Sequence, residues 1–408
     1  MGYLKFKVTA KEKKCRARTG ILRLRHGTIK TPELMPVATK ATVKALSTED
    51  LNELNAQLLI CNTYHLMLKP GAETVEKLGG LNKFMNWKKP LATDSGGFQA
   101  FSLGLGMEHG TGKMAKYFPG KGNSENINEN NILKRRTQKS TASISDKGIE
   151  FRSVYDNSRQ FLTPEKSIRI QEQLGADLIL VLDECTSPLS DKAYTKNSLE
   201  RTHRWAKECL EIHNTDQALA GIIQGGQWKD LREKSAKYIA SLPFDSIAIG
   251  GSLGKTKADM HKILDWVMPH LPENKPRHLL GIGVVEDIFE AVERGVDLFD
   301  CVGPTRMARA GYVYTTPKEG NVKNKFKYKI TSSKYKIDSS PIDKNCKCKV
   351  CKNHSRAYIN HLFNSNELLA YNLASYHNVH FFLNLMKDIR KAISEGKFLK
   401  LKKEWGIK

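Results

Sequence analysis

Eight short apolar runs recur along this chain, and they constrain its fold more than any other feature. Most of them are too short for a helix and are bounded by Gly, Pro, Asp or Asn, so each is expected to form a buried strand. The eight runs are Leu34–Ala38, Gln57–Cys61, Pro90–Thr93, Asp177–Leu182, Ala220–Ile223, Ser246–Ile249, His278–Ile282 and Val296–Phe299.

Amphipathic stretches with helical spacing lie between several of these runs. Strands that alternate with helices pair in parallel, and eight of them can close into a barrel. The fold class that we predict is therefore α/β, a (β/α)8 TIM barrel. The predicted helices are Glu165–Leu174, Leu199–Ile212, Leu231–Leu242, Lys257–Val267 and Val285–Arg294.

Polar residues stand at or directly after the carboxyl ends of several predicted strands. Asp94, Asp183 and Asp300 occupy such positions, and so do Gln224 and Gly251. In a barrel these ends meet on one face, where barrel enzymes build their active sites. Because a buried carboxylate is costly without a partner or a function, three converging acids predict a catalytic or binding site.

The charge of the chain indicates a polyanionic partner. Its 408 residues include 66 Lys and Arg against 43 Asp and Glu, which gives a net charge of +23. A solvated lysine-rich surface is one explanation of this excess, and it also fits attraction to nucleic acid or an anionic membrane. No run approaches the roughly 20 apolar residues of a membrane span, and no signal peptide is evident, so we expect a cytoplasmic location.

Two segments depart from the barrel pattern and set the expected domain boundaries. The segment 104–147 is expected to be a low-complexity insertion on a barrel loop, because its part Asn123–Ser145 has few large apolar residues. After Thr316 the chain becomes rich in lysine and then in clustered cysteines. We therefore expect a catalytic barrel over 1–316, and over 317–408 a zinc-binding subdomain with C-terminal helices, inserted near the last barrel helix.

Three of the eight cysteines lie within six residues. In a reducing compartment such a cluster indicates metal ligands rather than disulfides. A histidine from a following helix would complete a tetrahedral zinc site, and four protein ligands leave no open position, so one structural Zn²⁺ per chain is expected. The predicted ligands are Cys346, Cys348, Cys351 and His377, with His354, His361 and His380 as alternatives to His377.

The residues near the predicted acids are suited to a planar base. In the segment 94–99 the glycines allow a flat ligand to approach the backbone, Phe98 can stack on it, and Gln99 can bond its edge. Asp183 can pair with an amidine edge such as that of guanine, and Gln224 adds an amide. A carboxylate that attacks the anomeric carbon of a sugar, as in retaining glycosidases, would direct this pocket toward base exchange or base removal.

Asp300 is followed closely by two arginines. A Gly-Pro turn separates Asp300 from Arg306 and Arg309. Guanidinium groups bind phosphate well, so this stretch favours a substrate that carries phosphates.

With these motifs the chain resembles the tRNA-guanine transglycosylases. The resemblance covers nearly the whole chain apart from 104–147. It implies a (β/α)8 barrel with a zinc-bearing insertion, and an enzyme that exchanges the wobble guanine of GUN-anticodon tRNAs (Asp, Asn, His, Tyr) for a 7-deazaguanine. The motifs that carry it are Thr93–Gln99, Asp183–Thr186, Gln224–Gly226, Phe299–Val302 with Pro304–Arg306, and the cysteine cluster with its distant histidine.

The resemblance also implies roles for single residues. Asp300 matches the nucleophile, which forms a covalent aspartyl-ribose intermediate, and Asp94 matches a second aspartate that binds the base and relays its proton. Matches to base-binding positions are Asp183, Gln224, Gly251, Phe98, Gln99, Ser95 and Leu280, matches to anticodon-loop contacts are Arg306 and Arg309, and matches to the homodimer interface are Tyr358 and His361.

Ser252 and Lys255, which follow Gly251 in the chain, depart from the bacterial pattern of the family. Ser252 stands where a leucine is usual, and Lys255 stands near a glutamate that lies beside the aminomethyl group of the bacterial substrate. These departures leave two incoming bases open, queuine and 7-aminomethyl-7-deazaguanine. Cys185 beside Asp183 slightly favours the latter.

Two other functions remain open. The first is a non-catalytic tRNA-binding subunit of a heterodimeric transglycosylase, which the presence of all three acids disfavours. The second is the archaeal-type enzyme that modifies the tRNA D-arm, which usually carries extra C-terminal RNA-binding domains.

Overall fold

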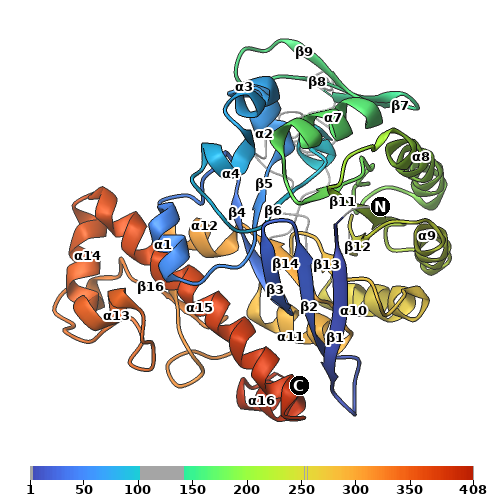
Figure 1. The fold of residues 1–408 in the computed structure, drawn as a ribbon. Coiled ribbons are helices and arrows are strands. Elements are labelled where there is room, and N and C mark those ends of the chain that lie inside the picture. Colours follow the sequence, from blue (N-terminus) through green and yellow to red (C-terminus); the bar gives the residue numbers. More distant parts are fainter. Residues whose placement is uncertain (1–2, 102–141, 252, 255, 408) are drawn as a thin grey trace, which may run out of the picture.

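The computed structural model describes residues 3–101, 142–251, 253–254 and 256–407. At its centre lies a closed barrel of eight parallel strands, in the order β4-β5-β6-β10-β11-β12-β13-β14 (Figure 1). Each predicted apolar run overlaps one of these strands, so the TIM-barrel prediction is confirmed. The strands are β4 Glu33–Ala38, β5 Leu59–Cys61, β6 Leu91–Thr93, β10 Leu178–Leu180, β11 Ala218–Ile223, β12 Ser246–Ile249, β13 Arg277–Leu279 and β14 Leu298–Cys301.

Helices surround the barrel, and the five predicted ones correspond to α7–α11. Only one start differs substantially, that of α8, which begins seven residues before the prediction. Its first turns are polar, and the side chain of Asp191 caps them by accepting from the Tyr194 N–H at 2.7 Å. The helices of this part are α1 Thr48–Glu53, α2 Thr63–Leu68, α3 Ala72–Lys77, α4 Gly80–Phe84, α7 Pro164–Leu174, α8 Lys192–Ile212, α9 Lys229–Ser241, α10 Lys257–Val267, η2 Met268–His270, α11 Val285–Glu293 and α12 Gly303–Arg309.

A three-stranded antiparallel sheet packs on the end of the barrel where its strands begin. Arg18 forms a buried ion pair of 2.6 Å with Asp297, which directly precedes β14. The backbone N–H of His26 donates to Asp177, which directly precedes β10. The sheet therefore lies at the end opposite to the rim that the carboxyl ends of the strands form. Its strands are β1 Lys5–Lys11, β2 Arg18–Leu24 and β3 Gly27–Thr31.

A second three-stranded sheet lies between β6 and α7. Of the expected insertion, 104–141 lies outside the described residues, and its last residues form β7 and the turn to β8. That turn is attached to α8, since Asp146 pairs with Arg204 at 2.7 Å and its carbonyl accepts from Trp205 Nε1 at 2.8 Å. The strands are β7 Ala142–Ser145, β8 Gly148–Arg152 and β9 Arg159–Leu162.

The C-terminal part forms a lobe beside the barrel, and the long helix α15 connects the two (Figure 1). Asn378 of α15 donates to the carbonyl of Pro304 in α12, and Arg390 donates to the carbonyl of Pro32 at the start of β4. The boundary at 316/317 remains a prediction. The elements are β15 Tyr312–Tyr314, β16 Lys327–Lys329, η3 Ser333–Tyr335, α13 Lys349–Asn353, α14 Arg356–Asn364, α15 Leu368–Ser394 and α16 Phe398–Glu404.

No helix in the described ranges has both the length and the apolar composition needed to cross a bilayer.

Candidate active site and metal site

The three predicted acids stand at the same rim of the barrel. Asp94 directly follows β6, Asp183 lies three residues beyond β10, and Asp300 is the third of the four residues of β14. Because all barrel strands are parallel, these three positions lie at the face where the strands end. The side chains therefore come together as the sequence predicts, although about 90 residues or more separate each from the next in the chain.

Asp94 is held by a set of hydrogen-bond donors. Its carboxylate accepts from Asn62 Nδ2 at 2.6 Å, from the Thr63 N–H at 2.9 Å and from Gln99 Nε2 at 3.1 Å. Burial nevertheless raises the pKa of Asp94 to about 7, and the nearby charge of Asp300 also raises it. Asp94 can therefore gain and lose a proton near neutral pH, and the two carboxylates are close enough to interact.

Asp300 is partly accessible. Its side chain is 18% exposed. Its Oδ1 lies 2.9 Å from His278 Nε2 and accepts from the Gly281 N–H at 3.0 Å.

Asp183 forms the other side of the group. It accepts from Gln224 Nε2 at 2.5 Å and from the Ser95 hydroxyl at 3.4 Å. Burial raises the pKa of Asp183 to about 6, against the effect of these hydrogen bonds. Since Ser95 directly follows Asp94, the hydroxyl of Ser95 connects the two acidic positions.

A glycine pair at the end of β12 forms one wall of the site. Gly251 has φ +81°, and a Cβ added there would lie 2.0 Å from Oε1 of Gln224. A Cβ on Gly250 would lie 3.1 Å from the Gln224 amide nitrogen and 3.3 Å from Leu280. Neither glycine can therefore be replaced by a residue with a side chain unless its neighbours move. Gln224 and Leu280 both pack against this glycine pair.

The remaining predicted residues surround this group. Phe98 lies in helical residues 97–101 and is 37% exposed, so its ring is accessible for stacking. Arg306 and Arg309 lie on α12, which directly follows β14. Within the described ranges neither guanidinium forms an ion pair, and burial together with Arg306 lowers the pKa of Arg309. Both are therefore available for phosphate.

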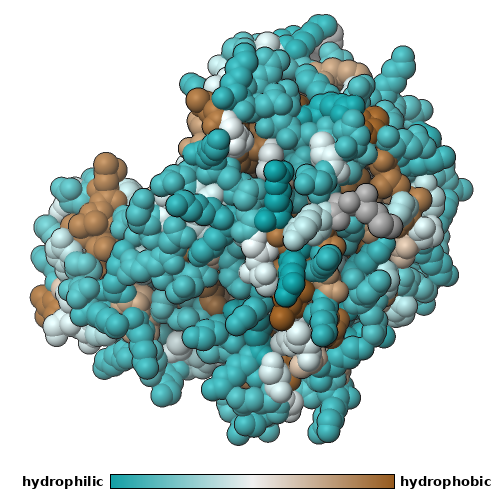
Figure 2. Space-filling model, in the orientation of Figure 1, coloured by the Kyte–Doolittle hydropathy of each residue, from teal (hydrophilic) through white to brown (hydrophobic). Residues whose placement is uncertain are grey.

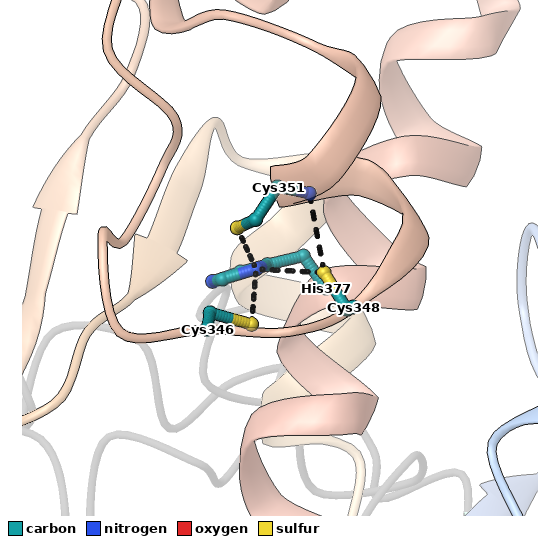
Figure 3. Close-up of side chains that lie close together, drawn as sticks. All are labelled: Cys346, Cys348, Cys351 and His377. Atoms are coloured by element: carbon teal, nitrogen blue, oxygen red, sulfur yellow. Dashed lines mark hydrogen bonds between the residues drawn. The ribbon is translucent and has the colours of Figure 1, made fainter.

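The cysteine cluster forms a compact group of metal donors (Figure 3). One ligand atom from each of Cys346, Cys348, Cys351 and His377 lies within 4.8 Å of all the others. His377 Nε2 lies 2.7 Å from the carbonyl oxygen of Tyr314, and this contact fixes the proton there. The lone pair of Nδ1 then points at the three thiols, as a metal ligand requires.

The alternatives to His377 are less well placed. Nδ1 of His380 lies 3.5 Å from Cys346 Sγ but also contacts the amide of Asn384. His354 stacks on Tyr358 instead, and His361 contacts Ser365. The chemistry of three thiols and one imidazole at this separation fits a tetrahedral zinc ion.

Comparisons with known proteins extend over nearly the whole chain. A profile of the family described as "Queuine tRNA-ribosyltransferase" matches residues 13–117 and 129–407. A putative queuine tRNA-ribosyltransferase of Archaeoglobus fulgidus is 50% identical over 404 residues, which cover 98% of this chain and 99% of the relative. A queuine tRNA-ribosyltransferase of Caldanaerobacter subterraneus subsp. tengcongensis is 44% identical over 408 residues, covering 99% and 97%. That of Fusobacterium nucleatum is 43% identical over 409 residues, covering 98% of each.

The chain belongs to the queuine tRNA-ribosyltransferase family.

Membership of the queuine tRNA-ribosyltransferase family confirms the predicted resemblance and the predicted enzyme class, a tRNA-guanine transglycosylase. The predicted departures at Ser252 and Lys255 lie outside the described residues.

Sequence reasoning missed three residues that support the site of this family member. Asn62, which bonds Asp94, directly follows β5, so the rule that selected Asp94 would also have selected it. His278 lies inside a predicted strand, where the neighbour of its side chain depends on the pairing with β14. Arg232 is fully buried and donates to the carbonyls of Gly226 and Gly250 at 2.7 and 2.9 Å, so it holds the glycine-lined walls, and no spacing in the sequence predicts this contact.

Proposed function

We propose that this protein exchanges the guanine at the first anticodon position of GUN-anticodon tRNAs (Asp, Asn, His, Tyr) for a 7-deazaguanine base. The observation that supports it best is the group of Asp94, Asp183 and Asp300 at one barrel rim, in a chain of this family. A protein that only bound tRNA would have no use for carboxyl groups such as Asp94 and Asp183, whose pKa values burial raises.

Asp300 is the proposed nucleophile. Its carboxylate attacks C1′ of the ribose, the C1′–N9 bond breaks, and the electron pair leaves with guanine. The resulting aspartyl-ribose ester holds the tRNA until the new base attacks C1′ and releases the carboxylate. Asp94, with a pKa of about 7, is suited to pass a proton to the departing base and to accept one from the incoming base.

Base recognition is proposed for the residues around Asp183. Its carboxylate accepts the amino and imino hydrogens of guanine, while Gln224 and the glycine wall at Gly251 face the carbonyl edge. The buried Oε1 of Gln224 has no hydrogen-bond partner among the described residues. As an acceptor it would be completed by an N–H of the base, whereas only Nε2 of Gln224 can donate to the carbonyl oxygen of the base. Phe98 and Leu280 would sandwich the ring, and Ser95 and Gln99 would orient the two acids.

Contacts to the tRNA are proposed for Arg306 and Arg309 and for the basic surface. The target nucleotide must leave its loop to reach a pocket at a barrel rim. Arginines beside Asp300 would bind the flanking phosphates, and the net charge of +23 would attract the remaining backbone. Because the substrate is tRNA, a cytoplasmic location is part of the proposal.

A structural zinc ion and a homodimer complete the proposal. The ion would be held by Cys346, Cys348, Cys351 and His377 and would fix the lobe, without a part in the chemistry. Tyr358, which is 39% exposed, and His361 would line the dimer interface. Figure 2 shows hydrophobic areas on this lobe within a mostly hydrophilic surface. The exposed large hydrophobic side chains among its described residues are Val322, Ile337, Tyr358, Leu368 and Leu369.

An exchange assay with the purified chain alone tests this function. Labelled guanine is expected to enter a GUN-anticodon tRNA at the wobble position, and not a tRNA with adenine there. A chain that binds tRNA but exchanges nothing alone would be the non-catalytic subunit of a heterodimer, and label in the D-arm would indicate the archaeal-type reaction.

The same assay identifies the incoming base. Offered 7-aminomethyl-7-deazaguanine, its nitrile precursor and queuine in competition with labelled guanine, the protein is expected to prefer the aminomethyl base. Preference for queuine would assign the alternative that the sequence leaves open.

A further inference from the structure

His278 lies against Asp300, and the reaction as proposed above gives it no role. It is the middle residue of β13, which pairs in parallel with the strand that carries Asp300. Its Nε2 lies 2.9 Å from Asp300 Oδ1, and its side chain is 1% exposed. An imidazole this deeply buried can hold a carboxylate in one orientation, because it has no room to move away.

Both donors to Asp300 act on the same oxygen. The Gly281 N–H donates to Oδ1 at 3.0 Å, alongside His278. In the part of the chain that the structure describes, no hydrogen bond ends on Oδ2. An oxygen without donors keeps its lone pairs for reaction, so the geometry points to Oδ2 as the atom that attacks the ribose.

The other ring nitrogen of His278 fixes its tautomer. Nδ1 is buried and has no hydrogen-bond partner among the described residues. A proton there would be a buried donor without an acceptor, which is costly. The neutral ring with its proton on Nε2 satisfies the contact with Asp300 and leaves Nδ1 without a proton.

We propose that His278 is a positioning residue for the nucleophile: its Nε2–H holds Oδ1 of Asp300 so that Oδ2 faces C1′, and it makes the carboxylate a better leaving group. This proposal rests on the proposed function. In the first step the Oδ2–C1′ bond forms, and the C1′–N9 electron pair leaves with guanine. In the second step N9 of the new base bonds to C1′, and the Oδ2–C1′ pair returns to the carboxylate.

The second step should depend most on His278. Negative charge returns to a carboxylate whose Oδ1 faces two preorganised donors, and such donors stabilise developing charge. Loss of one donor therefore makes the ester harder to displace. In the first step the same donor orients the carboxylate but also withdraws charge from it, so the two effects of losing it oppose each other.

Two substitutions separate the hydrogen bond from the shape of the side chain. His278→Gln keeps an N–H donor at about the reach of Nε2, whereas His278→Phe keeps a planar ring without a donor. We expect kcat to fall about tenfold to a hundredfold in the phenylalanine variant, the size of one charge-assisted hydrogen bond. The KM for tRNA should change little, and the glutamine variant should stay within severalfold of the wild type.

Stability provides the contrast with a purely structural role. Because the phenylalanine variant removes a buried nitrogen that lacks a partner, its melting temperature should equal or exceed that of the wild type. A residue that only stabilised the fold would lose stability and activity together. His278→Leu, which is smaller and also lacks a donor, gives the same comparison if the phenylalanine ring does not fit.

The decisive experiment follows the covalent adduct. Adduct formed with unmodified tRNA in wild-type, His278→Gln and His278→Phe protein is chased with excess guanine and followed on denaturing gels. The phenylalanine adduct should decay about tenfold more slowly than the other two. Equal decay of all three, or equal kcat in the two variants, would overturn the role of His278. If the wild type formed no adduct and exchanged no guanine, the proposed function itself would fail.

Discussion

The acid pocket at the barrel rim and the metal site in the lobe are both small groups of polar side chains, but the protein supports them in opposite ways. At the metal site, an ion would be the partner of the three thiols and of His377 Nδ1. The other ring nitrogen of His377, Nε2, already contacts the carbonyl of Tyr314. In the pocket, Gln99 Oε1, Gln224 Oε1 and His278 Nδ1 are buried without a hydrogen-bond partner among the described residues.

This contrast is expected if the metal site stabilises the fold and the acid pocket binds a substrate. A group that stabilises the fold is completed by the protein and its ion. A group that binds a ligand is left incomplete in the free protein. Here burial raises the pKa values of Asp94 and Asp183, because their hydrogen bonds do not fully compensate for it. Changes in the pocket should therefore reduce activity without loss of stability, and changes at the metal site should reduce stability first.

Asp300→Asn should have the largest effect on activity. An amide cannot form the ester, so guanine exchange should fall by about a thousandfold or more. Zinc content and melting temperature should stay at wild-type values, because Asp300 is partly exposed and no strand depends on its charge. Exchange of labelled guanine, together with metal analysis, measures both. Asp265→Asn, at a half-exposed carboxylate of α10, is the matched control.

Cys351→Ser should have the opposite pattern. Without its fourth ligand the zinc ion should be lost, and the free energy of unfolding should fall by roughly 4 kcal/mol or more, as for other lost metal sites. Denaturant unfolding and metal analysis test this. Cys209→Ser, at a buried cysteine of α8 outside the metal group, is the control. A zinc-free variant of wild-type stability would contradict a structural role.

Asp94→Asn should change how stability depends on pH. The folded-state pKa of Asp94 is raised from 3.8 to about 7, mainly by burial. Its favourable contribution to stability is therefore fully present below pH 3.8 and is lost as the pH rises through 7. The unfolding free energy of the wild type, relative to the variant, should fall by up to about 4 kcal/mol across this window. Urea titrations at pH 4, 5.5 and 7 measure the difference, and a constant difference would mean that Asp94 is already ionised at low pH.

Gly251→Ala should have a moderate effect, which is confined to binding of the base. A Cβ at this position meets Gln224 Oε1 at 2.0 Å, so we expect the KM for guanine to rise about tenfold, the cost of a displaced polar contact. Gly396→Ala is the matched control, since Gly396 has a similar φ of +67° and a Cβ there meets nothing within 4 Å. Equal effects of the two variants on KM would indicate backbone strain alone.

Arg306→Ala should have the smallest effect. Loss of one phosphate contact should weaken tRNA binding severalfold and reduce the slope of log affinity against log salt by about 1. Lys7→Ala, on the sheet at the other end of the barrel, should change neither quantity if binding takes place at the rim. Filter binding at several salt concentrations measures both variants.

The barrel and the group of three cysteines and one histidine were predictable from sequence because their signals are local. Each strand is a short apolar run with its own boundaries, and the helices α7–α11 repeat their apolar residues at the helical period. Three thiols within six residues indicate a metal without knowledge of the fold. Asp94 and Asp300 lie at the carboxyl ends of their strands, and in a parallel barrel these ends all meet at one face.

The contacts within the pocket were less predictable because they join distant strands. The contact of His278 with Asp300 depends on the register between β13 and β14. The hydrogen bonds from Arg232 to the carbonyls of Gly226 and Gly250 depend on how α9 packs against the barrel. The sheet β7–β9 was missed in part because β7 is short and alternates between half-buried and exposed residues, which resembles a loop. Such contacts need coordinates, and they include the donors that orient the reacting groups.

Mapping the covalent adduct tests the central claim most directly. Wild-type protein is mixed with an unmodified GUN-anticodon tRNA without free base, the trapped complex is digested with protease and nuclease, and the peptide that carries the ribose is identified by mass spectrometry. The ribose should be attached to Asp300. A ribose on Asp94 or Asp183, or full exchange activity with no adduct, would contradict the account.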